Sequence, residues 1–135
     1  MRVPVLVHGY RAGRIIVYMA TTVLIVDDHP GFRASARMLL EAEGFDVVGE
    51  AGDGRSGLEA AAELRPDVVL LDIQLPDMDG FHVADGLDVN GSGPAVVLIS
   101  SRAHEDLRGQ VEASPARGFI PKSELSGAAL EALIE

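Results

Sequence analysis

Apolar and polar positions along this chain alternate between two patterns, short apolar runs and longer helical repeats. Residues 23–26, 68–71 and 96–99 are each four consecutive apolar residues. Such runs are typical of strands that are buried on both faces, as in a parallel sheet. Together with two weaker stretches, they predict five strands, at residues 23–27, 46–51, 68–72, 95–100 and 118–120.

Helical patterns follow each predicted strand. The first, at residues 30–43, has an apolar face and ends before Gly44, a residue that suits a helix C-terminus. Strands that alternate with helices predict an α/β fold, a doubly wound five-stranded parallel sheet with helices on both faces. The other helices are expected at residues 55–64, from 80 to about 90, at 105–113 and at 126–135.

The first nineteen residues differ in composition from the rest. They contain three arginines and no acidic residue, whereas all 21 acidic residues come later. The uncharged run 15–26 is shorter than the roughly 20 residues of a membrane-spanning helix, and it ends in two aspartates rather than in a cleavage site. We therefore expect residues 1–19 to be a poorly ordered extension, upstream or introduced by cloning, and residues 20–135 to be one domain. Pairing of residues 15–18 onto a sheet edge is the alternative.

Composition narrows the class of protein. A chain of 135 residues with 47% hydrophobic and 24% charged residues is typical of a globular domain with its own core. The lack of cysteine excludes disulfides and thiolate metal sites and fits a reducing compartment, so we expect a cytoplasmic protein with no membrane contact. The net charge of −10 and the pI near 4.7 argue against nucleic-acid binding by this chain itself.

Chemically useful side chains follow the predicted strands. Asp27 and Asp28 follow the first apolar run, Asp72 the third strand and Ser100 the fourth, and Lys122 comes shortly after the fifth. Ligands of an open parallel sheet bind beyond the carboxyl ends of its strands. We therefore expect the carboxylates, the hydroxyl and the ammonium to converge on one edge, where they suit a divalent metal ion and a phosphoryl group.

In combination these motifs resemble the receiver domains of two-component response regulators. The resemblance covers residues 20–135 and rests on Val-Asp-Asp at 26–28, Leu-Leu-Asp-Ile-Gln-Leu-Pro-Asp-Met-Asp-Gly at 70–80, Ser100 and Gly-Phe-Ile-Pro-Lys at 118–122. Asp-Asp-His-Pro at 27–30 and Val-Gly-Glu-Ala at 48–51 are most similar to the subfamily that is often linked to helix-turn-helix output domains. The resemblance implies a flavodoxin-like sheet with strand order 2-1-3-4-5.

The resemblance also implies a metal-dependent phosphorylation site. Asp72 would be the phosphoacceptor, phosphorylated by a sensor histidine kinase or a phosphotransfer protein. Asp28, Asp72 and the backbone carbonyl of Gln74 would bind Mg²⁺ (or Mn²⁺) directly, with Asp27 acting largely through water. Such a domain catalyses its own phosphorylation and dephosphorylation without being a conventional enzyme.

The remaining site residues would stabilise the phosphoryl group or change conformation when it is bound. Lys122 would pair with one phosphoryl oxygen, and Ser100 would donate a hydrogen bond to another. The side chains of Gln74 and Arg102 would control access of water. Movement of Ser100 would let Phe119 rotate inward, which in the family reshapes the surface of the fourth helix, fifth strand and fifth helix. A homodimer through that face is a further expectation.

Three alternatives remain. Residues 52–57 match the Gly-x-Gly-x-x-Gly dinucleotide fingerprint and have Asp72 about twenty residues later, but this assignment gives the other site residues no purpose. A haloacid dehalogenase-like phosphatase needs a second aspartate where Gln74 stands. A receiver-like interaction module that acts without phosphorylation is the runner-up, because Ser123 and residues 114–115 depart from the usual receiver pattern.

Overall fold

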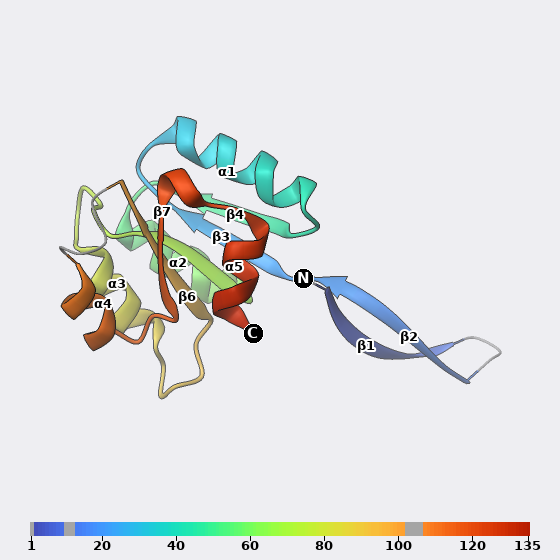
Figure 1. The fold of residues 1–135 in the computed structure, drawn as a ribbon. Coiled ribbons are helices and arrows are strands. Elements are labelled where there is room, and N and C mark those ends of the chain that lie inside the picture. Colours follow the sequence, from blue (N-terminus) through green and yellow to red (C-terminus); the bar gives the residue numbers. More distant parts are fainter. Residues whose placement is uncertain (1, 10–12, 102–106) are drawn as a thin grey trace.

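The computed structural model describes residues 2–9, 13–101 and 107–135. The centre is a sheet in the order β4-β3-β5-β6-β7, and every neighbouring pair is parallel (Figure 1). Counted along the domain, this is the order 2-1-3-4-5, so the predicted fold class is confirmed. The strands are β3 (Thr22–Val26), β4 (Asp46–Ala51), β5 (Val68–Asp72), β6 (Ala95–Ser100) and β7 (Gly118–Pro121).

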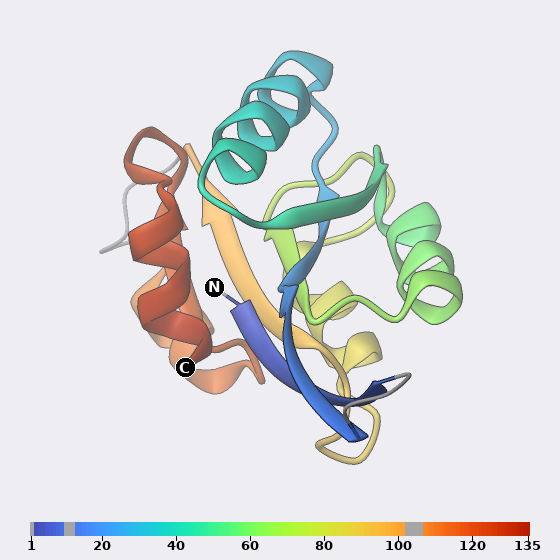
Figure 2. The ribbon, with the colours of Figure 1, turned by 90° about the vertical axis from the view of Figure 1, so that its right-hand side faces the viewer.

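Helices cover both faces of this sheet. Helices α1 and α5 pack on one face and α2, α3 and α4 on the other (Figures 1 and 2). Most bounds agree with the predicted helices, but the predicted start of the fourth helix at residue 105 lies outside the described residues. The helices are α1 (Pro30–Ala42), α2 (Gly54–Leu64), α3 (Gly80–Leu87), α4 (Arg108–Ala113) and α5 (Gly127–Ile134).

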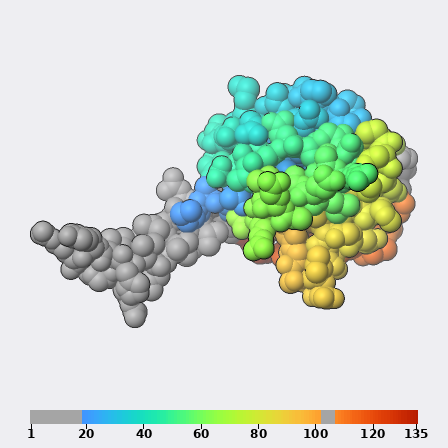
Figure 3. Space-filling model, turned by 180° about the vertical axis from the view of Figure 1, so that it is seen from behind, coloured from blue at the N-terminus to red at the C-terminus, as the bar shows by residue number. Residues whose placement is uncertain are grey.

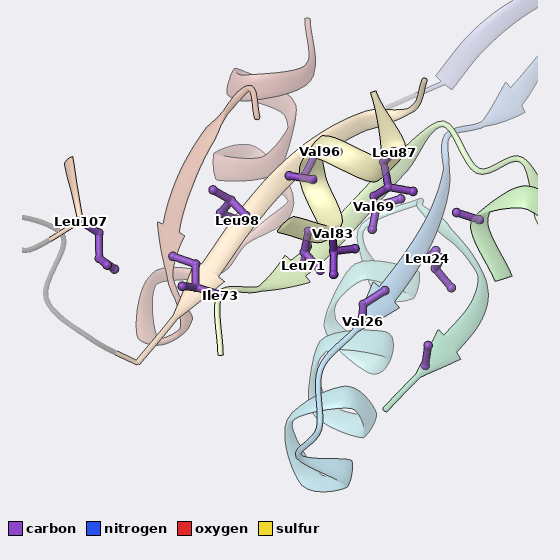
Figure 4. Close-up of a cluster of buried hydrophobic side chains, with 13 residues drawn as sticks. Leu24, Val26, Val69, Leu71, Ile73, Val83, Leu87, Val96, Leu98 and Leu107 are labelled. Atoms are coloured by element: carbon purple, nitrogen blue, oxygen red, sulfur yellow. The ribbon is translucent and has the colours of Figure 1, made fainter. Parts of the chain in front are cut away.

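The central strands send alternate residues into two apolar layers. In β3, Leu24 and Val26 face the layer of α2 and α3, whereas Val23 and Ile25 face the layer of α1 and α5. Strands β5 and β6 alternate in the same way, and Figure 4 shows the first of these layers. Because both faces are buried, these strands are apolar at nearly every position, which is the pattern that the sequence shows.

Short polar side chains begin three of the helices. Asp53, Asp79 and Ser126 each accept a hydrogen bond from a backbone N–H in the first turn of α2, α3 and α5, respectively. Each such cap contributes about 1 kcal/mol to helix stability. The caps of α2 and α3 set where the loops after β4 and β5 end, and the second of these loops begins directly after Asp72. Figure 3 shows the face of the molecule that carries α2, whose residues are green.

The segment before the domain contains two paired strands, and its predicted poor order stays a prediction. Strands β1 (Arg2–Gly9) and β2 (Gly13–Ala20) make a separate antiparallel sheet, in which Val5 lies opposite Val17. Residues 15–18 therefore pair with β1 and not, as the alternative had it, with an edge of the larger sheet. Many residues here are β-branched, which favours strands. That the segment is an extension of the domain stays a prediction.

Candidate functional site

The carboxyl ends of two central strands bring two aspartates to one edge of the sheet. Asp27 directly follows β3, and Asp72 is the last residue of β5. The two strands are neighbours, with Val26 opposite Leu71, so the two carboxyl groups end side by side. Asp27 is 0% exposed and Asp72 3%. Two buried carboxylates repel each other and need a cation nearby.

Lys122 supplies that positive charge. It begins a short 3-10 turn directly after β7, and its side chain is 14% exposed. Its Nζ donates a hydrogen bond to Asp72 Oδ2 at 3.0 Å and lies 2.7 Å from Asp27 Oδ2. The second contact is an ion pair without hydrogen-bond geometry, and Asp27 Oδ2 has no hydrogen-bond partner among the described residues.

These close contacts shift the pKa values of Asp72 and Lys122. Burial raises the pKa of Asp72, and the negative charge of Asp27 adds to the rise, although the N–H of Gln74 and the ammonium of Lys122 oppose it. Partial burial would lower the pKa of Lys122, but the two carboxylates outweigh it and raise that pKa. The cluster therefore holds a firmly charged ammonium between two carboxylates that still lack part of their neutralisation.

Asp28 and His29 complete the cluster at its mouth. The side chain of His29 is 67% exposed, as expected for a loop residue, and its Nδ1 lies 3.2 Å from Asp27 Oδ1 and 3.1 Å from Asp28 Oδ1. One potential ligand atom from each of Asp27, Asp28, His29 and Asp72 falls within a 4.8 Å span. Carboxylate oxygens in this number suit a hard divalent cation. Asp27 Oδ2 is buried and, among the described residues, is paired with the Lys122 ammonium without a hydrogen-bond partner, which supports the same fit.

The loop after β5 closes tightly over Asp72. The backbone N–H of Gln74 donates to Asp72 Oδ1 at 3.0 Å, and Gly80 N–H donates to Ile73 O at 2.7 Å. A side chain at Gly80 would collide with the backbone carbonyl of Asp72, so only glycine allows this approach. The loop thus holds one face of the Asp72 carboxylate. That the carbonyl of Gln74 is a metal ligand stays a prediction.

Ser100 is the last residue of β6, and Phe119 lies within β7. Ser100 is 1% exposed and is paired with Pro121 across β6 and β7. Phe119 is partly buried and packs against the apolar layer of α2 and α3. The conformational roles predicted for Ser100 and Phe119 stay predictions. Arg102 lies outside the described residues.

Three residues near the site were not anticipated. The ring of Phe32, on α1, has the Lys122 Nζ 4.7 Å from its centroid. Arg33 Nη1 donates to the backbone carbonyl of Asp27 at 2.6 Å, and Arg33 Nε to Glu50 Oε1 at 3.1 Å. The sequence assigned Phe32 to an apolar helix face, and no local pattern marks Arg33. The only usable signal was the closeness of both residues to Asp27 along the chain.

Asp77, the third of these residues, excludes the dinucleotide alternative at residues 52–57. Its carboxylate accepts hydrogen bonds from the N–H groups of Gly54 at 2.7 Å and Arg55 at 2.9 Å, at the N-terminus of α2. These hydrogen bonds lower the pKa of Asp77. A pyrophosphate bound by that motif would need the same N–H groups. The first turn of α2 is therefore already occupied by the loop that follows Asp72.

Comparison with known proteins decides the family. Residues 23–135 match the model of the response regulator receiver domain. The chain belongs to this family. It is 39% identical over 106 residues to the transcription regulator BvgA of Bordetella pertussis and 38% identical over 86 residues to the nitrate/nitrite response regulator NarL of Escherichia coli. These alignments cover 78% and 63% of this receiver chain.

Solved receiver structures share the fold. The signal receiver domain of the response regulator NarL from Mycobacterium tuberculosis is 34% identical in sequence, with a TM-score of 0.75. The superposition covers 84% of this chain and 96% of that one. The chain spans about half the length of the curated relatives that it matches, 51% of BvgA and 40% of NarL. Within the described part of this receiver, no helix has the length and apolar character needed to span a bilayer.

Proposed function

We propose that this receiver accepts one phosphoryl group on Asp72 from a sensor histidine kinase or a phosphotransfer protein, and that the change alters a surface that other proteins recognise. The observation that carries this proposal is the contact of Lys122 Nζ with both Asp72 Oδ2 and Asp27 Oδ2, at 3.0 and 2.7 Å. An ammonium beside a carboxylate that will gain further charge suits phosphoryl transfer.

In the proposed reaction, a carboxylate oxygen of Asp72 forms a bond to the phosphorus of a phosphohistidine as the phosphorus–nitrogen bond breaks. The bonding electron pair returns to the imidazole nitrogen of the donor, and the product is an acyl phosphate. Lys122 then pairs with a phosphoryl oxygen, and Ser100, at the end of β6, donates a hydrogen bond to another. Asp72 needs no general base, because it attacks as the carboxylate.

Asp28, Asp72 and the carbonyl of Gln74 would hold Mg²⁺, with Asp27 contributing largely through water. When bound, the cation supplies positive charge that reduces repulsion between the Asp72 carboxylate and the incoming phosphoryl oxygens. The fit rests on the acidic cluster at the mouth of the site and on the buried Asp27 Oδ2.

The proposed output is a change in the surface formed by α4, β7 and α5. Phosphorylation adds charge and strong acceptors at Asp72, which draws Ser100 toward them and leaves room for Phe119. A homodimer through this face belongs to the same proposal. So does a cytoplasmic location. The second candidate, an interaction module that acts without phosphorylation, keeps the surface but not the chemistry.

Intact-mass spectrometry tests the chemistry directly. The chain is incubated with acetyl phosphate or phosphoramidate and Mg²⁺, and its mass is expected to rise by one phosphoryl group. The adduct should disappear in Asp72→Asn and when EDTA replaces Mg²⁺. Asp67→Asn, which changes an aspartate at the other end of the same strand, is the matched control and should be phosphorylated normally. An unmodified mass for the wild-type protein would favour the interaction module.

A further inference from the structure

Among the described residues, two carboxylates and one aromatic ring lie against the ammonium of Lys122. The ring is that of Phe32, with Nζ 4.7 Å from the ring centroid. Phe32 belongs to the first turn of α1, whereas Lys122 follows β7, so the contact joins segments that are ninety residues apart in sequence. An ammonium within about 6 Å of an aromatic centroid is attracted by the negative face of the ring.

Packing alone explains only part of this placement. Phe32 is partly buried and lies against the apolar layer of α1 and α5, a role that a leucine would also fill. An aliphatic side chain, however, would offer the Lys122 ammonium no attraction. Lys122 is also the only lysine of the chain, and the other ten basic residues are arginines. A compact ammonium, unlike a guanidinium, can rotate its three N–H donors while it stays in one place.

We propose that Phe32 is a positioning residue for phosphoryl transfer, whose ring face holds the Lys122 ammonium at the mouth of the site while its N–H groups change partner from carboxylate to phosphoryl oxygen. The inference rests on the function proposed above. The ring attracts the charge without accepting a directional hydrogen bond, so it leaves all three donors for oxygen atoms. It also occupies a side of the ammonium from which water would otherwise compete with the phosphoryl group.

Fluorinated phenylalanines separate this role from packing. Successive fluorine atoms weaken the negative face of the ring at nearly constant shape. We expect the phosphorylation rate of the full chain with phosphoramidate and Mg²⁺ to fall stepwise from phenylalanine to trifluorophenylalanine at position 32, by about 3- to 10-fold at the end of the series. Phe32→Leu should be slowed to a similar degree, and Phe32→Trp should keep the rate of the wild type or exceed it.

Phe45 provides the matched control. It is buried in the same apolar layer, at 4% exposure, and no cation lies over its ring among the described residues. The same fluorinated residues at position 45 should change stability as much as at position 32 but leave the rate unchanged. Equal slowing at both positions would mean that the rate follows packing, and the proposal would fail.

Lysine labelled with ¹³C provides a measurement that needs no phosphorylation. Because Lys122 is the only lysine, one set of ε-CH₂ signals reports the contact. A ring beneath the ammonium should move the proton signals upfield, and Phe32→Leu should return them to the position of a free lysine. Unshifted signals in the wild type would overturn the geometry.

The outcomes distinguish this inference from the proposed function. If the wild-type protein is phosphorylated but the rate does not change along the fluorine series at position 32, the role of Phe32 is refuted and the receiver chemistry stands. A wild-type protein that is never phosphorylated would refute both, because Phe32 would then have no transfer to assist, even if the upfield shift were present.

Discussion

Aspartates at the two edges of the sheet have different partners for their carboxylates. At the amino edge, just before β5, Asp67 Oδ2 accepts hydrogen bonds from Thr22 N–H at 2.8 Å and Thr22 Oγ1 at 3.1 Å, and Asp67 N–H donates to Thr22 Oγ1 at 2.9 Å. At the carboxyl edge, Asp27 and Asp72 share one ammonium, and Asp27 Oδ2 has no hydrogen-bond partner in the part of the chain that the structure describes. The Asp67 carboxylate, which accepts hydrogen bonds from Thr22 of the neighbouring strand β3, holds two strands together, whereas a crowded, incompletely neutralised pair is suited to bind a ligand.

The larger of two hollows in the described structure lies at the amino edge, away from the acidic cluster. A hollow of about 900 Å³ lies at the amino edge between α2, α3 and the loop after α3, where Leu58, Ala61, Leu87 and Pro94 contribute to a mostly apolar lining. Beside the Asp72 loop the hollow is only about 360 Å³, and Gln74 and Phe81 line part of it. The size of a hollow therefore does not follow the position of the acidic cluster.

Removing the ammonium should have the largest effect on the carboxyl edge. In Lys122→Met the phosphorylation rate should fall on the order of 100-fold, because the charge that stabilises the transferring group is lost from a buried site. Initial rates by intact mass measure the change. Arg55→Met removes an exposed cation that pairs with Glu59 and should leave the rate unaltered. Rates within twofold of the wild type for both variants would contradict the role of Lys122.

Metal binding should stabilise the wild type through the carboxyl edge alone. At 100 times the dissociation constant, Mg²⁺ is expected to raise the free energy of unfolding by about 2.7 kcal/mol. Asp28→Asn should lose most of this gain, whereas Asp46→Asn, an exposed aspartate at the start of β4, should retain it. Thermal unfolding with and without Mg²⁺ measures both. A gain that survives Asp28→Asn would place the ion elsewhere.

Charge removal should have opposite signs at the two edges. Without metal, Asp72→Asn relieves the repulsion with Asp27 and should raise the free energy of unfolding by about 1 kcal/mol. Asp67→Ala breaks the hydrogen bonds to Thr22 and should lower it by about 1 kcal/mol. Urea unfolding in EDTA compares the two variants. Destabilisation of the same size in both would mean that the carboxyl edge is structurally satisfied after all.

The smallest expected effect concerns the ion pairs behind the site. The hydrogen bond from Arg37, together with Arg33, lowers the pKa of Glu50, whose side chain is 29% exposed. A carboxyl group with a lowered folded-state pKa contributes stability above its unfolded pKa, ordinarily 4.5, and that stability is lost as the pH falls through the folded-state pKa. The contribution should be about 0.5 kcal/mol. Unfolding curves of wild type and Glu50→Gln should converge below this range.

Local patterns in the sequence were sufficient to predict the five parallel strands and the meeting of Asp27, Asp72 and Lys122 at one edge. Apolar runs at 23–26, 68–71 and 96–99, alternating with helical patterns, are typical of strands with two buried faces. Once those strands are parallel neighbours, the residues that follow them must meet at one edge. Asp27, Asp72 and Lys122 could therefore be assigned to one cluster before any distance was known.

Contacts that depend on how helices and loops pack were decided only by the tertiary structure. Phe32 looked like any apolar helix residue, because the position of its ring beneath Lys122 depends on how the first turn of α1 meets the turn after β7. Asp77 looked like an ordinary turn residue, because its bonds to Gly54 and Arg55 join two loops that are distant in sequence. The separate sheet of β1 and β2 likewise depends on pairing between these two strands. Periodic burial is recorded residue by residue along a chain, whereas such long-range contacts exist only after the elements have packed together.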